Sequence, residues 1–328
     1  MSFDSLVLNP VRKFLDRRVE VPEGASWAVE REGDKTRLIL EVSASNLSKN
    51  LQEDLAATPS FLLCLAYWLE RATGHPTLCE LRVTGVAPKD GSELLHWRRA
   101  LFVIEQLERA VPRRLTVKSP AHWQWPNAPI LNAAQTDRSN DAEGGSRPEH
   151  ILETDLCQSD AARLAFSRQV APVLQFKRQL PVGLFSGVVS KNTHFTPGNK
   201  SQVDLWTCSP DGDTLHLFEL KAKGNAQVGI LPELLYYVRL LHHVRTNLSI
   251  RGDDSVLQVL RATKRIVAWM VAPKVHPLVY CQGESPLVWL NDGMKEDAVE
   301  MRILPIELDQ DGKWARWRVE EKWPGSPS

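Results

Sequence analysis

The stretch that decides the fold is Val203-Asp204-Leu205-Trp206-Thr207, which is followed, after the turn formers Pro210-Asp211-Gly212-Asp213, by Thr214-Leu215-His216-Leu217-Phe218-Glu219-Leu220-Lys221. Two apolar runs on either side of such a turn predict an antiparallel β-hairpin. Side chains two residues apart share one face of a strand. We therefore expect Glu219 and Lys221 to project together, Phe218 and Leu220 to enter a core, and Asp204 to lie at the same end of the hairpin.

The surroundings of this triplet distinguish it from a chance occurrence. Acid-x-Lys also occurs at Asp311-Gly312-Lys313, in a polar turn, and at Glu320-Glu321-Lys322, in a charged tail. Glu219, by contrast, lies between apolar residues, follows a hairpin that contains a second acid and precedes an amphipathic helix. The alternative is a solvated cross-strand ion pair with little energetic weight. We favour a functional site.

Composition and net charge are those of an ordinary globular protein. The 328 residues are 43% hydrophobic and 24% charged, as in ordinary globular proteins, and the 40 basic residues equal the 40 acidic ones. No global positive field therefore argues for nucleic-acid binding. The segment 159–200, however, contains six basic residues and only one acidic residue, Asp160. This excess of positive charge belongs either to a solvated surface or to a surface that binds phosphate.

The cysteines and the N-terminus bear on the compartment. Five widely spaced cysteines include no C-x-x-C pair, which argues against a zinc site or a disulfide framework and fits a reducing cytoplasm. We expect no signal peptide and no membrane span, since no apolar segment approaches the roughly 18–20 residues that a span needs. Motifs typical of P-loop ATPases, serine hydrolases and zincins are absent from the sequence.

A polar stretch at 135–148, rich in turn formers, divides the chain. We expect an N-terminal mixed α/β domain at 1–134, a linker at 135–150 and a second domain at 151–328. In the first domain the patterns predict a hairpin at 26–30 and 36–43, a buried helix at 60–72, a strand at 78–86 and a helix at 92–110. In the second they predict a helix at 160–170, a strand at 180–189, the acidic hairpin, a helix at 231–244 and strands at 265–275 and 300–308.

From 160 to 275 this order of residues resembles the PD-(D/E)xK nuclease superfamily, whose members have the restriction-endonuclease-like fold. In that family an acid opens the second core strand, E-x-K or D-x-K lies on the third, and the next helix often contains Gln-x-x-x-Tyr. Asp204, Glu219 and Lys221 match the strand positions. The helix position matches Glu233-Leu234-Leu235-Tyr236-Tyr237, with Glu233 in place of glutamine.

The resemblance implies metal-assisted hydrolysis of phosphodiester bonds. Carboxylates on adjacent strands, here Asp204 and Glu219, bind Mg²⁺ and leave positions for water and phosphate; Mn²⁺ is an alternative. The backbone carbonyl of Leu220 is an implied further ligand, and Lys221 would hold or activate the attacking water. Glu233 either supplies another ligand or faces solvent.

The family also has an acid on its first helix. That position stays open here among Asp160, Glu149 and Glu153.

We thus expect an α/β protein with a restriction-endonuclease-like mixed sheet flanked by helices in its C-terminal part. Its predicted function is that of a Mg²⁺-dependent nuclease acting on nucleic acid, DNA in first place, in the cytoplasm. The alternative is a catalytically silent nuclease-fold protein that binds nucleic acid or scaffolds a complex. The N-terminal domain would recruit a protein partner, a ligand or the substrate, and a homo-oligomer stays open. Tryptophans in polar segments, including Trp123 and Trp125, are expected in a core or an interface more than in base stacking.

Overall fold

The computed structural model describes residues 2–131, 148–197, 201–222 and 227–319. The N-terminal part contains, in chain order, η1 (Asp4–Leu8), α1 (Asn9–Leu15), β1 (Ser26–Glu32), β2 (Lys35–Ser43), α2 (Ala44–Leu47), α3 (Thr58–Thr73), β3 (Thr77–Thr84), α4 (Gly91–Ala110), β4 (Leu115–Lys118) and β5 (Pro129–Leu131). The remainder contains α5 (Pro148–Gln158), α6 (Asp160–Gln169), β6 (Lys177–Pro181), β7 (Leu184–Ser186), β8 (Gln202–Cys208), β9 (Thr214–Leu220), α7 (Ile230–Thr246), α8 (Asp254–Ala262), β10 (Arg265–Ala272), α9 (Leu287–Met294), η2 (Lys295–Asp297), β11 (Val299–Leu308) and β12 (Trp314–Trp317).

The N-terminal sheet has the strand order β1-β2-β3-β4. β1 and β2 form the predicted antiparallel hairpin, and β3 and β4 follow in parallel after the crossover helices α3 and α4. Helix α3 begins with Pro59 in its first turn, where no N–H donor is needed, and ends at Gly74, which adopts a left-handed φ of 72°. The predicted elements of this part are all present, with bounds shifted by a few residues.

The second sheet is mixed, with the order β12-β11-β10-β9-β8-β6. β8 and β9 form the predicted antiparallel hairpin, whereas β9, β10 and β11 run parallel. β10 is buried along nearly its whole length, as its continuous apolar sequence predicted. The chain is therefore a mixed α/β protein, as expected.

One predicted strand is wrong. The segment 180–189 does not form a single strand, because β6 ends at Pro181 and β7 begins at Leu184. Proline cannot donate to a ladder, and Gly183 follows two positions later. β7 pairs with β5 in a separate two-stranded sheet, while Val188 and Val189 lie exposed beyond it.

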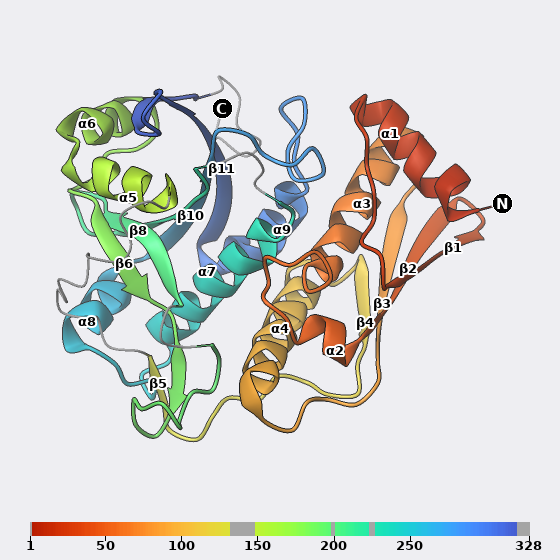
Figure 1. The fold of residues 1–328 in the computed structure, drawn as a ribbon, viewed down its shortest axis with the longest axis horizontal. Coiled ribbons are helices and arrows are strands. Elements are labelled where there is room, and N and C mark those ends of the chain that lie inside the picture. The colour runs from red at the N-terminus through yellow and green to blue at the C-terminus, as the bar shows by residue number, and fades with distance from the viewer. Residues whose placement is uncertain (1, 132–147, 198–200, 223–226, 320–328) are drawn as a thin grey trace.

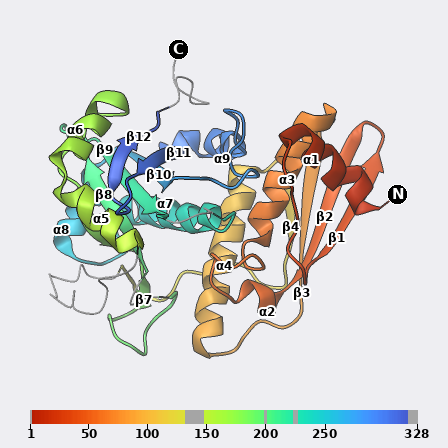
Figure 2. The same ribbon diagram turned by 45° about the horizontal axis from the view of Figure 1, so that its top comes forward.

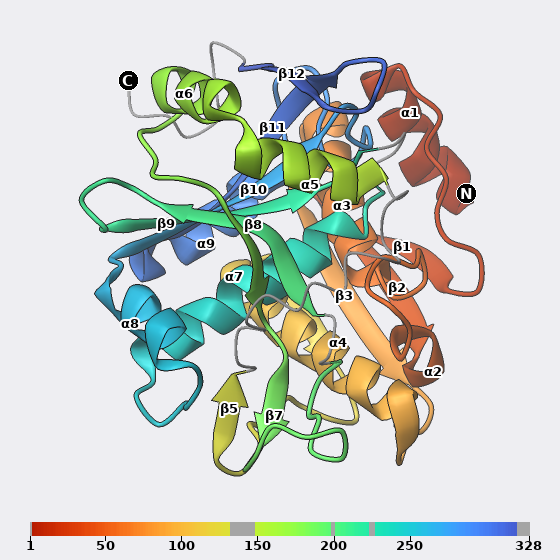
Figure 3. The same ribbon diagram turned by 60° about the vertical axis from the view of Figure 1, so that its left-hand side comes forward.

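Helices cover both faces of the second sheet. α5 and α6 lie against one face and α7 against the other (Figure 3). The side of α5 and α6 holds a separate cluster of buried aromatic residues around Phe166, including Trp269 and Trp317. Trp317 donates its indole N–H to the carbonyl of Ala162 at 2.9 Å. The expectation of a core role is thus confirmed for this tryptophan.

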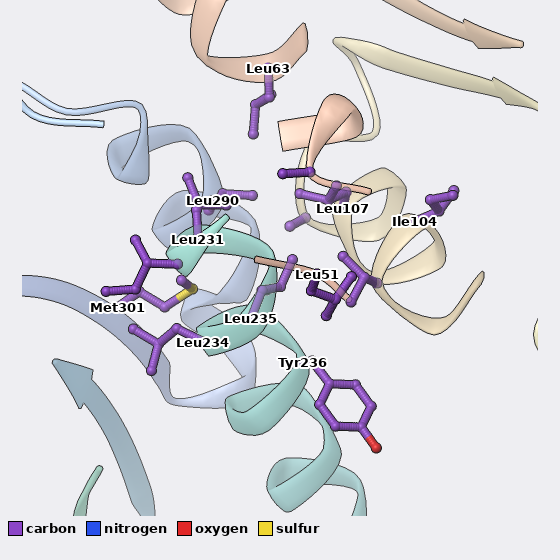
Figure 4. Packing of buried hydrophobic residues seen from close by; sticks show 14 of the residues in the cluster. Leu51, Leu63, Ile104, Leu107, Leu231, Leu234, Leu235, Tyr236, Leu290 and Met301 are labelled. Atoms are coloured by element: carbon purple, nitrogen blue, oxygen red, sulfur yellow. The ribbon is translucent and has the colours of Figure 1, made fainter. Parts of the chain in front are cut away.

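The two sheets lie on either side of a layer of helices (Figure 1). Figure 2 shows α4 between α7 and the N-terminal sheet. One hydrophobic cluster runs through this layer and joins both parts of the chain. Its centre brings together Leu107 of α4, Leu235 of α7 and Leu290 of α9, together with Leu51 from the loop after α2 (Figure 4).

Backbones approach closely at this junction. A Cβ on Gly293 of α9 would lie 1.7 Å from the carbonyl oxygen of Ala110, at the end of α4. A Cβ on Gly229, just before α7, would lie 2.7 Å from the Cα of Gln52. Residues 135–147 of the expected linker lie outside the described residues, and the last three, 148–150, begin α5. Glycine at 229 and 293 is what allows the N-terminal part to pack directly against the second.

Within the described residues, none of the helices is both long enough and apolar enough to cross a lipid bilayer.

Candidate active site

The hairpin brings the two strand acids to one end, as the sequence predicted. Leu205 pairs with Phe218, so the next positions, Asp204 and Glu219, stand opposite one another on the other face. The backbone N–H of Leu220 donates to Asp204 Oδ2 at 2.7 Å. This contact fixes the Asp204 carboxylate beside β9.

Lys221 shares the face of Glu219, as expected from the period of two. Its Nζ lies 2.7 Å from Glu219 Oε1 and 3.8 Å from Glu233 Oε2. Only 3% of the surface of Glu219 is exposed. The alternative of a solvated surface pair is therefore wrong, because these charges are buried together.

Glu233 points into this group from the first turn of α7. Gln52 Nε2 donates to both of its carboxylate oxygens, at 3.1 and 2.8 Å, and the Tyr237 hydroxyl donates at 2.9 Å. Glu233 is 5% exposed, so the alternative in which it faces solvent is wrong. The Glu-x-x-x-Tyr pair on α7 is thus part of the site, since residues four apart lie one above the other on a helix.

These side chains line one cavity of about 480 Å³, which we call the acidic cavity. It is lined by Asp204, Glu219, Leu220, Lys221, Glu233 and Tyr237 from the hairpin and α7, by Glu149, Pro197, Ser201 and Gln202, and by Asn50, Gln52, His96 and Arg99 from the N-terminal part. All five site residues named from the sequence therefore meet in one place.

Sequence reasoning missed the N-terminal contribution. Arg99 is 5% exposed and donates to Asn50 Oδ1 and to His96 Nδ1, both at 3.2 Å, while its Nε has no partner among the described residues. No motif marks Gln52 or Arg99, and a contact across 181 residues, such as that of Gln52 with Glu233, has no local signal. The guanidinium of Arg99, contributed by α4, is the principal addition.

The three acids considered for the first helix lie in different surroundings. Of the three, only Glu149, which is exposed, lines the acidic cavity. Glu153 is buried, is paired with Arg178 at 2.9 Å and contributes to raising the pKa of Asp204. Asp160 forms an exposed pair with Arg163 at 3.0 Å and lies away from the cavity.

The basic excess before the hairpin does not supply the charge of the cavity. Arg163 and Arg178 are engaged by carboxylates, and Lys177 lies 4.6 Å from the ring of Trp206. None of the described basic residues of 159–197 lines the acidic cavity, and Lys200 lies outside the described residues. Among the described lining residues, the lysine and arginine side chains of this cavity are Lys221 and Arg99.

Burial dominates the electrostatics of the site. It raises the pKa of Asp204 to about 7, against the opposing effects of Lys221 and of the Leu220 N–H. Burial, with Asp204 and Glu233 nearby, holds the pKa of Glu219 well above its usual range. For Lys221 burial acts to lower the pKa, but the three carboxylates together raise it above its usual value. The lysine is therefore an ammonium in the protein.

The residues present fit a hard divalent cation in one respect. Glu219 Oε2 is buried and has no hydrogen-bond partner among the described residues, so a cation bound there would satisfy this oxygen. Among the described residues, no group of three or more His, Cys, Asp or Glu side chains forms a complete metal site. Mg²⁺ is commonly held by only one or two carboxylates, with water and substrate phosphate completing its shell.

Comparisons with models of protein families, with curated proteins and with solved structures find no match to this chain.

Proposed function

We propose that the chain is a metal-dependent nuclease whose C-terminal part has the restriction-endonuclease-like fold, and that its substrate is nucleic acid, DNA in first place. The observation that supports this proposal is the meeting of Asp204, Glu219 and Lys221 in one buried acidic cavity, with the Lys221 ammonium 2.7 Å from Glu219. Buried, repelling charges cost stability, so a fold retains them where chemistry requires them.

In this proposal Asp204, Glu219 and the carbonyl of Leu220 hold Mg²⁺ or Mn²⁺. The bound ion would neutralise charge on the phosphate and lower the pKa of a water molecule. Lys221 orients the attacking water and, as an ammonium, offsets charge that builds on the phosphate oxygens. Arg99 of α4 offers a second cation to the cavity. Gln52 and Tyr237 hold Glu233 in position, where its carboxylate keeps Lys221 charged.

The test is cleavage by the purified chain of linear, circular and single-stranded DNA and of RNA, with Mg²⁺, with Mn²⁺ and with EDTA. We expect metal-dependent cleavage that falls by at least about 100-fold in Glu219→Gln and Lys221→Ala, the scale on which electrostatic catalytic groups act. The chain provides a matched control in its second acid-x-Lys triplet. Lys313→Ala, in the exposed Asp311–Lys313 turn, should cleave like the unaltered protein.

Cleavage that survives Glu219→Gln and Lys221→Ala would place the chemistry elsewhere. Absence of cleavage on every substrate and metal would overturn catalysis and favour the catalytically silent alternative.

A further inference from the structure

A second cavity, of about 700 Å³, lies between α4 and the loops 122–127 and 186–195. We call it the aromatic cavity, after its wall residues Trp123, Trp125 and Phe195, which are joined by Arg98. Its volume lies within the range of about 300–1,000 Å³ that is typical of small-molecule sites. None of the residues assigned above to the acidic cavity lines it.

The rings of this cavity pack nearly at right angles. Trp123 and Trp125 have centroids 5.5 Å apart at 82°, and Trp123 and Phe195 are 5.3 Å apart at 78°. Trp123 is buried and belongs to the core, which confirms the expectation for that residue, whereas Trp125 and Phe195 are only half-buried. The cavity therefore presents partly open aromatic surface on a well-packed support.

The described lining of the aromatic cavity contains Arg98 and, among the residues that the structure describes, no aspartate or glutamate, although the chain has as many acids as bases. The guanidinium of Arg98 lies 4.2 Å from the centroid of the Phe195 ring, and no ion pair is seen for it in the described part of the chain. Flat aromatic surface next to an uncompensated guanidinium is the combination that binds unpaired bases of an anionic strand.

The two cavities border one short segment of the chain: Phe195 lines the aromatic cavity and Pro197, two residues later, lines the acidic one. Both cavities also border α4, on different sides of the helix. Leu94, Trp97, Arg98 and Leu101 form one stripe that lines the aromatic cavity, whereas His96 and Arg99, about half a turn around the helix, line the acidic one. A strand whose phosphate lies in the acidic cavity would therefore reach the aromatic cavity past the segment 195–197.

We propose that the aromatic cavity binds an unpaired base of the nucleic-acid strand whose phosphate enters the acidic cavity, so that the preferred substrate is single-stranded. The identity of the ligand as nucleic acid rests on the proposed function. Bases inside a duplex are stacked on one another and expose no face to a protein ring, whereas single-stranded bases do. Trp125 supplies the stacking surface, and Arg98, whose guanidinium lies over the Phe195 ring, attracts the backbone.

The test is binding in EDTA, where cleavage does not interfere. Fluorescence anisotropy would compare a labelled single-stranded deoxyoligonucleotide with its duplex, for the full chain and its variants. We expect tighter binding of the single strand, and a loss of about fivefold to 100-fold in Trp125→Ala, the range for removal of one stacking ring. Gln124→Glu, which adds a carboxylate at an exposed lining position, should weaken single-strand binding more at low salt than at high salt.

Two matched controls separate local from general effects. Trp27→Ala removes another half-buried tryptophan, on β1, and Gln169→Glu adds the same charge at an exposed position at the end of α6. Both should bind the single strand like the unaltered chain. Trp125→Phe keeps an aromatic ring and should keep most of the affinity, which guards against loss of folding in Trp125→Ala.

The outcomes distinguish this proposal from the nuclease proposal. If the chain cleaves nucleic acid but Trp125→Ala and Gln124→Glu bind the single strand unchanged, base binding here is wrong and the nuclease proposal stands. Equal affinity for single strand and duplex would also overturn it. If no substrate is cleaved, yet both variants lose single-strand affinity while the controls keep it, the aromatic cavity binds bases without catalysis.

Discussion

Gln52 and Glu233, 181 residues apart in the chain, form a two-pronged contact in which the Gln52 amide nitrogen donates to both carboxylate oxygens. The contact joins the loop after α2 to the first turn of α7. It places the amide group in the N-terminal part and the carboxylate on the helix, where the resembled family often has glutamine. The N-terminal part therefore completes the site and does not only flank it.

An exchange of the amide and the carboxylate tests this contact. Gln52→Glu would set two carboxylates against each other in a buried position and should lower the free energy of unfolding by about 2–4 kcal/mol, measured by urea denaturation. Adding Glu233→Gln restores one donor and one acceptor, so the double variant should recover most of the loss. If the two effects simply add, the side chains are not in contact.

The raised pKa of Asp204 predicts that its contribution to the free energy of unfolding falls as the pH rises. Because the folded pKa is about 7 and the ordinary value is 3.8, the native state holds a proton that the unfolded chain has released between these values. The contribution of Asp204 to stability is therefore lost as pH rises through this window. In EDTA, the difference in free energy of unfolding between Asp204→Asn and the unaltered chain should shift in favour of the variant by on the order of 1–3 kcal/mol from pH 5 to pH 8. Asp292→Asn, at an exposed position, should show no such gain.

Metal binding has a readout that is independent of cleavage. Mg²⁺ bound to the folded chain should raise its melting temperature by several degrees at saturating concentration, because a ligand that binds only the native state stabilises it by mass action. Glu219→Gln should abolish this shift, whereas Glu296→Gln, in the exposed η2 turn, should retain it. An identical shift in both variants would rule out Glu219 as a ligand.

The position of Arg99 predicts how nucleic-acid binding depends on ionic strength. If this buried guanidinium faces substrate phosphate, Arg99→Met should weaken nucleic-acid binding and reduce the slope of log affinity against log salt by about 1. The exposed Arg113 is the control, since Arg113→Met removes the same charge from a position that lines neither cavity. An unchanged slope in Arg99→Met would show that Arg99 only supports Asn50 and His96.

The packing of α9 on α4 predicts a single unfolding transition. Gly293→Ala would place a Cβ 1.7 Å from the Ala110 carbonyl oxygen and should cost about 3 kcal/mol or more, because backbone atoms must move. Gly33→Ala, in the open β1–β2 turn, should cost only about 1 kcal/mol of left-handed strain. Calorimetry that resolves two transitions, of which Gly293→Ala affects neither, would contradict a shared core.

The sequence predicted the acidic hairpin because its signals are local. Alternation of side chains, the turn at Pro210–Gly212 and the buried sequence of β10 all act over a few residues. The same local signals placed Asp204, Glu219 and Lys221 on one face, and helical spacing added Glu233 and Tyr237. These features needed no knowledge of distant contacts.

The remainder of the site depends on tertiary packing. Gln52 and Arg99 enter the cavity because α4 and the loop after α2 pack against α7, and no sequence pattern encodes that juxtaposition. The different surroundings of Glu149 and Glu153 also depend on tertiary contacts, because Glu149 lines the cavity while Glu153 pairs with Arg178 of β6. The single predicted strand at 180–189 failed because the chain leaves β8 after Val182, whose N–H donates to the carbonyl of Ser201, and residues 184–186 pair with β5 instead.

The burial of α7 between the two sheets has a consequence for folding during synthesis. The N-terminal part leaves the ribosome first, and the face of α4 that will meet α7 has no partner until residues 230–246 have been translated. During that interval an apolar surface stands open to water and to other nascent chains. Folding of the N-terminal part should therefore be completed late, and expression of 1–134 alone should yield a chain that aggregates or depends on chaperones.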